Sequence, residues 1–251
     1  MAAFYLPGGI PIYGYSILLG LGTGIGLAWV VLSSPRKQAH THLTAGLWVV
    51  FGGLLGARAV FVALNWPYFQ AHLGESALFF LGGLAWPGAL AGGLLALGIY
   101  AWINRLPLGS LADALLPLAA GLAVSAWMGC WLEGCAYGLA TKAWWGLPGR
   151  DEWGAAALRI PTQLLGALLT LLMIGLLDWG QKRFHRSGLA TALALMGLSL
   201  ELFGLSFLRA DPAPLWNGVR LEAWAALVFA GVAGVAILFT ALPHNGAREK
   251  R

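Results

Sequence analysis

Long apolar runs alternate with short polar loops along the whole chain, and this pattern sets the fold class. Each run has about the 20 residues that an α-helix needs to cross a bilayer. We therefore expect an all-α integral membrane protein of about seven transmembrane helices, with residues 1–251 forming a single transmembrane domain. The expected spans cover approximately residues 10–32, 43–65, 87–103, 111–132, 161–179, 189–208 and 223–242.

The approach to the third span is irregular. Gly82-Gly83, Pro87 and Gly92-Gly93 interrupt an apolar run that begins near Ala77. Breaks of this kind free backbone groups, which must then be satisfied inside the protein because the bilayer core holds no water. We predict a broken or re-entrant segment near residues 77–92.

Composition supports the membrane class and excludes several others. Hydrophobic residues make up 59% of the chain and charged residues only 10%, against about 25% charged in an ordinary globular domain. The net charge is +5, but the basic residues sit in loops and form no amphipathic stripe, so we expect no nucleic-acid partner. The two cysteines and five histidines form no metal-ligand motif, and we expect neither a metal nor a cofactor.

The distribution of Lys and Arg predicts the orientation in the membrane. One set of loops carries the excess: Arg36, Lys37, Arg105, Lys182, Arg183, Arg186, Arg248, Lys250 and Arg251. The other set carries fewer: Lys142, Arg150, Arg159, Arg209 and Arg220. Because basic loops stay in the cytoplasm, we predict an outer N-terminus and a cytoplasmic C-terminus. The polar, tryptophan-rich stretch 133–160 is then an outer interfacial loop.

Two ionisable residues lie within apolar runs, where they are costly and commonly functional. Arg58 is suited to clamping the phosphate of a lipid headgroup with its planar fork. The alternative is an ion pair with Asp113 or Glu201 that only holds helices together. Glu201 is a candidate general base, and a buried partner for an arginine is the competing interpretation.

Both cysteines lie at the end of the fourth expected span, on either side of Glu133 and Gly134. A continuous helix would point Cys130 and Cys135 apart, but Gly134 can bend the chain and bring them within disulfide reach. Three interpretations stay open: packing of two small apolar residues, a disulfide, and a reactive thiol.

Two further polar positions coincide with expected helix starts. Asp113 is placed to stabilise the start of the fourth span through the helix dipole, or to orient an arginine in a cavity. Arg159 and Gln163 flank Pro161, where a helix N-terminus can bind an anion or simply be capped by its own side chains.

Together these residues resemble the prolipoprotein diacylglyceryl transferases of bacteria. The shared motifs follow the chain in order: Tyr13-Gly14, Gly56-Ala57-Arg58, residues 82–88, Asp113 with Pro117, residues 159–164, and Phe207-Leu208-Arg209. The resemblance implies a multi-pass protein of the bacterial cytoplasmic (inner) membrane. The family moves a diacylglyceryl group from phosphatidylglycerol to the cysteine of a lipoprotein precursor.

The departures from the family pattern fall on polar positions. The arginine, asparagine and glutamate of the family's central motif correspond here to Trp127, Cys130 and Cys135, and a histidine corresponds to Pro87. Glu201 lies one place from a family position in the sixth span. The glycines and prolines of the family pattern are present, while most of its polar positions carry apolar side chains in this chain.

Site roles follow from the resemblance and from what group transfer requires. Such a transfer needs a cation beside the leaving phosphate and a base for the acceptor thiol. The expected catalytic residues are Arg58, Glu133 and Glu201. Headgroup binding is expected from Tyr13, Arg58, Arg159, Gln163 and Arg209, and a structural or redox role from Asp113, Cys130 and Cys135.

The functional hypothesis is a transferase-like membrane protein that binds phospholipid and diverges from the standard reaction. Its expected partners are phosphatidylglycerol and a lipoprotein precursor. The alternative is a non-catalytic lipid-binding or structural subunit of a larger membrane complex. A different enzyme that uses the two cysteines is a third reading.

Overall fold

The computed structural model describes residues 2–5, 11–79, 82–151, 153–180 and 186–241. Seven helices in this part are long and apolar enough to cross a membrane, which confirms the predicted fold class. They are α1 (Gly14–Ser33), α2 (Ala39–Leu64), α4 (Trp86–Ile103), α6 (Leu116–Glu133), α7 (Thr162–Gly180), α8 (Leu189–Ser206) and α9 (Leu221–Ala241).

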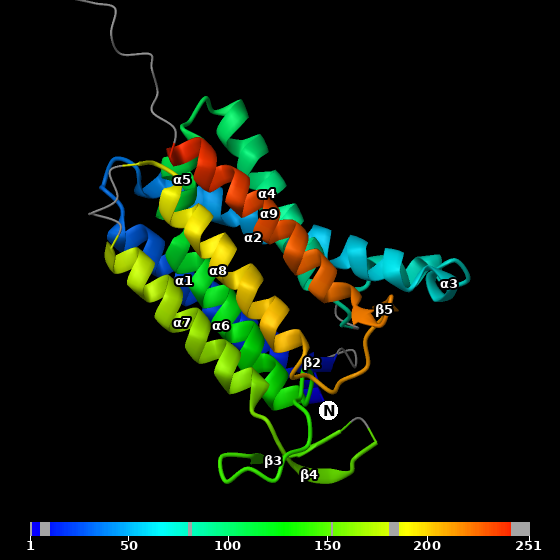
Figure 1. The fold of residues 1–251 in the computed structure, drawn as a ribbon. Coiled ribbons are helices and arrows are strands. Elements are labelled where there is room, and N and C mark those ends of the chain that lie inside the picture. Colours follow the sequence, from blue (N-terminus) through cyan, green and yellow to red (C-terminus); the bar gives the residue numbers. More distant parts are fainter. Residues whose placement is uncertain (1, 6–10, 80–81, 152, 181–185, 242–251) are drawn as a thin grey trace, which may run out of the picture.

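Short elements lie at the ends of these helices. The small helices are α3 (Trp66–Phe69), the 3-10 helix η1 (Leu73–Ala77) and α5 (Leu108–Ala114). Three antiparallel two-stranded sheets pair β1 (Ala2–Tyr5) with β2 (Pro11–Tyr13), β3 (Leu147–Arg150) with β4 (Ala156–Arg159), and β5 (Leu215–Trp216) with β6 (Val219–Arg220). All three sheets and α3 lie at one end of the bundle, here called the strand end (Figure 1). The opposite end, called the loop end, carries α5.

Glycines let two pairs of helices approach closely. A Cβ atom at Gly56 of α2 would overlap the carbonyl oxygen of Gly88 in α4, and one at Gly88 would overlap that of Gly56. Gly22 of α1 and Gly121 of α6 oppose each other in the same way. Small residues favour such contacts because helices in lipid associate through packing and not through exclusion of water.

The buried core runs along the bundle in three clusters. One, on α1, α2, α4, α5 and α6, includes Leu97, Leu111 and Leu118. A second joins α6, α7 and α8 through Leu116, Ile174, Ala190 and Ala194. The third lies nearer the strand end and contains Trp127, Ala136, Ala167 and Leu205. The third cluster packs α6 against α7 and α8, the helices that carry several of the candidate site residues.

The irregular approach to the third span is present. The chain leaves η1, passes Leu78 and the 3-10 residue Phe79, runs through residues 82–85 without regular structure, and enters α4 at Trp86 with Pro87 in its first turn. Proline is tolerated there because the first helical N–H groups have no partner within the helix. Gly92 and Gly93 do not break the helix, since both lie inside α4 and face α2.

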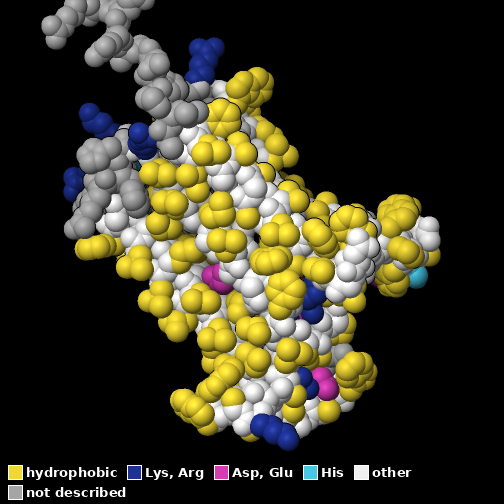
Figure 2. Space-filling view, in the orientation of Figure 1, with side chains coloured by type: hydrophobic (Ala, Val, Ile, Leu, Met, Phe, Trp, Pro, Cys, Tyr) yellow, Lys and Arg dark blue, Asp and Glu magenta, His cyan; other side chains and the backbone are white. Residues whose placement is uncertain are grey.

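The surface between the two ends is apolar. Hydrophobic side chains cover most of the visible face of the bundle, and most of the visible Lys and Arg lie toward its ends (Figure 2). Large exposed residues such as Leu32, Leu95, Leu176 and Leu238 point away from the core. This arrangement suits helices surrounded by lipid, which are apolar on their outer faces as well as inside.

Candidate functional site

Arg58 is buried in α2, with 4% of its surface exposed. Its guanidinium donates hydrogen bonds to four backbone carbonyls, those of Glu75 (2.6 Å), Ser76 (2.8 Å), Gly82 (2.5 Å) and Gly83 (3.2 Å). In the described residues these carbonyls, and neither Asp113 nor Glu201, are its hydrogen-bond partners. The side chain therefore fastens the segment between η1 and α4 to α2.

The rings of Phe61 and Phe69 add to this attachment. The carbon at the centre of the Arg58 guanidinium lies 5.6 Å from the Phe61 ring centroid and 5.3 Å from that of Phe69. Cation–π contacts of this kind gain strength where water is excluded. Most donors of Arg58 are engaged, so it is poorly placed to clamp a phosphate.

Asp113 and Glu133 both cap a helix other than their own. Asp113 lies in α5, and its carboxylate accepts hydrogen bonds from the backbone N–H groups of Gly188 and Thr191 and from the Thr191 hydroxyl. Glu133 ends α6 and accepts a hydrogen bond at 2.8 Å from the N–H of Gly14, the first residue of α1. Carboxylates are favoured at these positions because helix N-termini carry unsatisfied donors and partial positive charge. Tyr13 is the residue that directly precedes α1.

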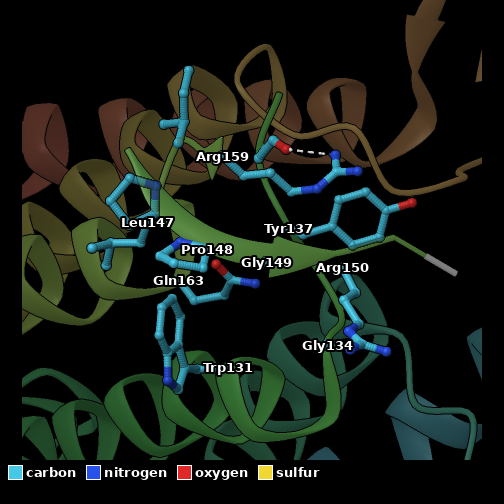
Figure 3. Close-up of a pocket in the computed structure, with 12 residues that line it drawn as sticks. Trp131, Gly134, Tyr137, Leu147, Pro148, Gly149, Arg150, Arg159 and Gln163 are labelled. Carbon is cyan, nitrogen blue, oxygen red and sulfur yellow. Dashed lines mark hydrogen bonds between the residues drawn. The ribbon is translucent and has the colours of Figure 1, made fainter. Parts of the chain in front are cut away.

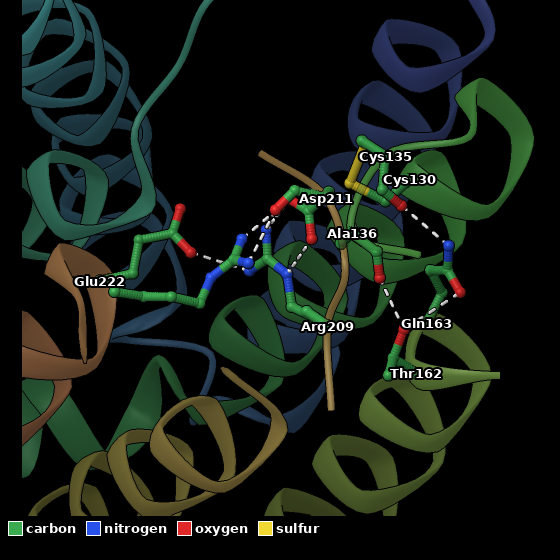
Figure 4. Close-up of a disulfide and its surroundings, with 9 residues drawn as sticks. Cys130, Cys135, Ala136, Thr162, Gln163, Arg209, Asp211 and Glu222 are labelled. Atoms are coloured by element: carbon green, nitrogen blue, oxygen red, sulfur yellow. Dashed lines mark hydrogen bonds and ion pairs between the residues drawn. A yellow bond between two sulfur atoms is a disulfide. The ribbon is translucent and has the colours of Figure 1, made fainter. Parts of the chain in front are cut away.

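The two cysteines form a disulfide at the strand end (Figure 4). Gly134 ends α6 with a φ of 75°, which closes the turn that brings Cys135 back to Cys130. Two side chains at the start of α7 hold the same turn: the Thr162 hydroxyl donates to Ala136 O (2.6 Å) and the Gln163 amide to Cys135 O (2.8 Å). Of the three interpretations of the cysteines, the disulfide is the one observed.

Glu201 lies where α6, α7 and α8 meet. Its Oε1 accepts hydrogen bonds from the Trp127 indole N–H (3.1 Å) and the Thr170 hydroxyl (2.9 Å). The Trp127 ring fills the space beside Gly166, where a Cβ atom would overlap it. The carboxylate of Glu201 is therefore bound by two neutral donors, the Trp127 indole and the Thr170 hydroxyl.

Arg209 belongs to a cluster of charges at the strand end of α8 and α9 (Figure 4). It donates to Asp211 at 2.8 and 2.6 Å and to Glu222 at 2.9 Å. Burial alone would lower the pKa of Arg209, but hydrogen bonds and charge from these two carboxylates outweigh it and raise the pKa above its ordinary value. Arg220 joins the cluster, with Nη2 at 3.1 Å from Asp211 Oδ2. Asp211 and Glu222 therefore balance the positive charge of Arg209.

Arg159 lines a cavity of about 100 Å³ beneath the β3–β4 hairpin (Figure 3). Its Nη2 pairs with Asp151 at 3.1 Å, its Nη1 donates to Gly138 O at 3.3 Å, and its guanidinium carbon lies 4.8 Å from the Tyr137 ring centroid. Arg150, Gln163 and Trp131 line the same cavity. Two arginines and Gln163, in the first turn of α7, thus border one small space.

Two buried donors beside this cavity lack a partner. Tyr137 is 6% exposed and the Arg159 side chain 11% exposed. Among the described residues, neither the Tyr137 hydroxyl nor Arg159 Nε has a hydrogen-bond partner. Buried polar groups are rarely left unpaired, and each such case calls for an explanation such as an absent ion or water.

The site residues that the sequence predicted as one group lie in separate parts of the structure. Arg159 and Gln163 border one cavity, whereas Arg58, Glu133, Glu201 and Arg209 each lie in a distinct cluster. Sequence reasoning did not identify the partners Tyr137, Asp151, Asp211 and Glu222. Arginines and carboxylates do lie close together in residues 150–159 and 209–222, a signal of local ion pairing that was present in the sequence.

The fold and these clusters define a multi-pass helical membrane protein with a small cavity at its strand end. The chain belongs to the prolipoprotein diacylglyceryl transferase family, whose model matches residues 1–240. This finding confirms the family resemblance drawn from the sequence motifs.

Relatives named phosphatidylglycerol–prolipoprotein diacylglyceryl transferase cover most of the chain. The protein of Thermosynechococcus vestitus is 30% identical over 84% of this chain and 84% of its own length. Transferase 2 of Streptomyces coelicolor is 32% identical over 95% of this chain and 79% of its own. The protein of Corynebacterium glutamicum is 30% identical over 89% and 78%.

Proposed function

We propose that the chain binds the anionic headgroup of a phospholipid, phosphatidylglycerol being the first candidate, in the cavity beneath the β3–β4 hairpin. The observation that carries this proposal is the pair of unpartnered buried donors, Tyr137 OH and Arg159 Nε, beside a cavity that Arg150 also borders. A phosphate oxygen is a suitable acceptor for guanidinium and hydroxyl donors. Gln163, in the first turn of α7, lines the same cavity, where a helix N-terminus contributes partial positive charge.

We further propose that the standard transfer of a diacylglyceryl group to a lipoprotein cysteine is lost in this chain. Transfer requires a cation at the leaving phosphate and a base at the acceptor thiol. Arg58 and Arg209 are engaged by carbonyls and carboxylates. By the sequence motif, Trp127 corresponds to the family's central arginine. Removing several preorganised groups together costs orders of magnitude in rate.

The corresponding location is the bacterial cytoplasmic membrane, with the strand end outside. This placement rests on the basic residues concentrated in loops of the opposite end and on the disulfide at the strand end. A disulfide persists in an oxidising compartment and is rare in the cytosol.

Lipid retention tests the binding half of the proposal. The protein is purified from vesicles of mixed phosphatidylglycerol and phosphatidylethanolamine, and retained lipid is identified by mass spectrometry. Phosphatidylglycerol should be enriched in the wild type, and Arg159→Gln and Arg150→Gln should each reduce that enrichment severalfold. Lys142→Gln, which alters another basic residue at the strand end, is the matched control. Equal retention in all four proteins would reject the cavity as the headgroup site.

A peptide assay tests the second half. A lipobox peptide is incubated with the protein in phosphatidylglycerol vesicles, beside the Thermosynechococcus relative as a positive control. The expected result is no change in peptide mass with this chain and a gain of one diacylglyceryl group with the relative. A gain with this chain that Arg159→Gln abolishes would mean that transfer survives with a rebuilt site.

A further inference from the structure

Glu201 is a carboxylate inside a span, and its observed partners are neutral. It lies five residues before α8 ends at Ser206, which places it about 7.5 Å from the strand end of that helix at 1.5 Å per residue. Among the described residues it is bound by Trp127 and Thr170, and no lysine or arginine forms an ion pair with it. An acidic group at this depth is costly, and such groups usually meet a partner.

Part of the Glu201 carboxylate stays available to a further donor. The Trp127 indole donates to Oε1, and the Thr170 hydroxyl lies 2.9 Å from Oε1 and 3.1 Å from Oε2. A hydroxyl carries one proton, so Thr170 can donate to only one of these oxygens at a time. A carboxylate has about four acceptor sites, which leaves sites on Oε2 unused. Glu201 is also partly exposed, so the side chain is open to the surroundings of the bundle.

An apolar surface borders this carboxylate. α8 packs between α7 and α9 (Figure 1). Leu200, Gly204 and Phe207 are exposed and follow one another about one turn apart along α8. A Cβ atom added at Gly204 would meet nothing within 4 Å, so the helix has an open notch there. With the exposed Leu169 of α7, these residues and Glu201 are called the Glu201 surface.

We propose that the Glu201 surface docks a transmembrane helix of a partner protein, and that this helix carries a lysine or arginine at the depth of Glu201. Acyl chains surround a span at this depth, and they offer no hydrogen-bond donor. A basic side chain from a second helix would supply both a donor for Oε2 and the missing positive charge. The attraction between the two charges is strong where the dielectric constant is low.

The shape of the surface supports the same occupant. Helices associate in lipid through close packing, and small residues allow their backbones to approach. Gly204 provides such a position three residues after Glu201, on a neighbouring part of the helix surface. The exposed Leu200 and Phe207 on either side offer apolar contacts to a partner that is itself surrounded by lipid.

A designed transmembrane peptide tests the proposal with the full-length protein. The peptide is a helix of leucine and alanine with one arginine, placed as far from its labelled end as Glu201 is from the end of α8. Matched peptides carry leucine or glutamate at that position. The protein is labelled at Trp144→Cys, since its two native cysteines are joined in a disulfide. Association in phosphatidylcholine vesicles is measured by energy transfer between the two labels.

The arginine peptide should associate severalfold more strongly than the leucine peptide, and the glutamate peptide should show no gain. Glu201→Gln should reduce the arginine peptide to the level of the leucine peptide, because the amide carries no charge. Equal association of the arginine peptide with Glu201→Gln and with the unsubstituted protein would overturn the proposal. Retention of phosphatidylethanolamine that depends on Glu201, without any preference for the arginine peptide, would also overturn it and make a lipid the occupant.

Gly204→Leu tests where the helix docks. The new side chain fills the notch while Glu201 is unchanged, so association of the arginine peptide should fall severalfold. Gly24→Leu on α1 is the matched control, because a Cβ atom at either glycine meets nothing within 4 Å. Equal association with the two variants would contradict docking over Gly204. If Glu201→Gln does not fold, this pair of variants still decides the docking surface.

Discussion

Asp113 illustrates how single charged residues act in this bundle. Its carboxylate leaves α5 and accepts two backbone N–H groups and one hydroxyl at the start of α8. One side chain thereby satisfies donors that a helix start otherwise leaves unpaired. Asp113 is 75 positions before Gly188 and 78 positions before Thr191 in the sequence. Loss of these hydrogen bonds therefore affects how α5 packs against α8 and not α5 alone.

Replacing this carboxylate should destabilise the protein measurably. Asp113→Ala removes the cap of α8, and a lost cap of this kind costs about 0.5–2 kcal/mol. We expect a lower thermal unfolding midpoint in detergent for Asp113→Ala. Ser110→Ala is the control on the same helix, because Ser110 is exposed and its side chain donates to the carbonyl of Pro107 in its own turn. An unfolding midpoint for Asp113→Ala that matches the control would contradict the capping role.

The sequence identified such residues but not their partners. Arg58, Asp113, Glu133 and Glu201 stand out because charge near or within an apolar run is costly. Arg58 binds backbone carbonyls, Asp113 and Glu133 each bind the N-terminus of another helix, and Glu201 binds an indole. These partners lie 17–119 positions away in the sequence. A backbone carbonyl or N–H carries no mark in the sequence, so these pairings could not be predicted from residue types.

At the scale of helices, two close contacts organise the bundle. α2 meets α4 through Gly52, Gly56, Gly88 and Gly92, and α1 meets α6 through Gly22 and Gly121. In each case a Cβ atom would overlap the backbone of the opposite helix. The contacts therefore depend on the absence of side chains, which separates them from ordinary side-chain packing.

A valine at one of these positions should force the helices apart. Gly88→Val places atoms against Gly56 and Val60, and overpacking of this kind costs about 1–3 kcal/mol or more. Gly98→Val on the same helix is the matched control, because its added Cβ meets nothing within 4 Å. The measurement is the fraction of protein that stays monodisperse after heating in detergent. Equal losses for the two variants would remove the close contact as the cause.

The lengths of the apolar runs predicted the helices well, but they did not predict which helices pack against each other. Runs of about 20 apolar residues correspond to seven helices. Glycines at spacings of four, such as Gly52 with Gly56 and Gly88 with Gly92, favour close approach. The spacing alone did not tell which helix pairs with which. The stretch expected as one span over residues 111–132 is divided, because α5 ends at Ala114 and α6 begins at Leu116 with Pro117 in its first turn. An apolar run conceals such a break.

For the whole molecule, the orientation in the membrane is the prediction with the widest consequences. Trp144 lies at the strand end and Gln38 in the loop between α1 and α2 at the loop end, and both are exposed. With the N-terminus outside, an impermeant maleimide should label Trp144→Cys in intact cells and Gln38→Cys only after permeabilisation. The reverse pattern would invert the orientation and place the disulfide in the cytosol.

The assembly of the strand end could not be predicted from the sequence, because it depends on which distant segments pair with each other. Gly138 bridges Arg209 and Ala140 bridges Arg159 through backbone pairing, so three distant segments meet beside the cavity. The family resemblance indicated that residues 159 and 209 matter. It did not indicate that Arg159 borders a cavity while Arg209 is neutralised by Asp211 and Glu222. That difference depends on which carboxylate folds back onto which arginine.

The disulfide has a practical consequence for handling the protein. Cys130 and Cys135 close the turn that carries Trp131 and Gly134, two residues of the cavity wall. Protein made by cell-free synthesis with reductant, or purified in dithiothreitol, would lack this covalent closure even when its helices are intact. We therefore expect preparations of identical sequence to differ in lipid retention according to their thiol history, so the oxidation state needs to be established before any two preparations are compared.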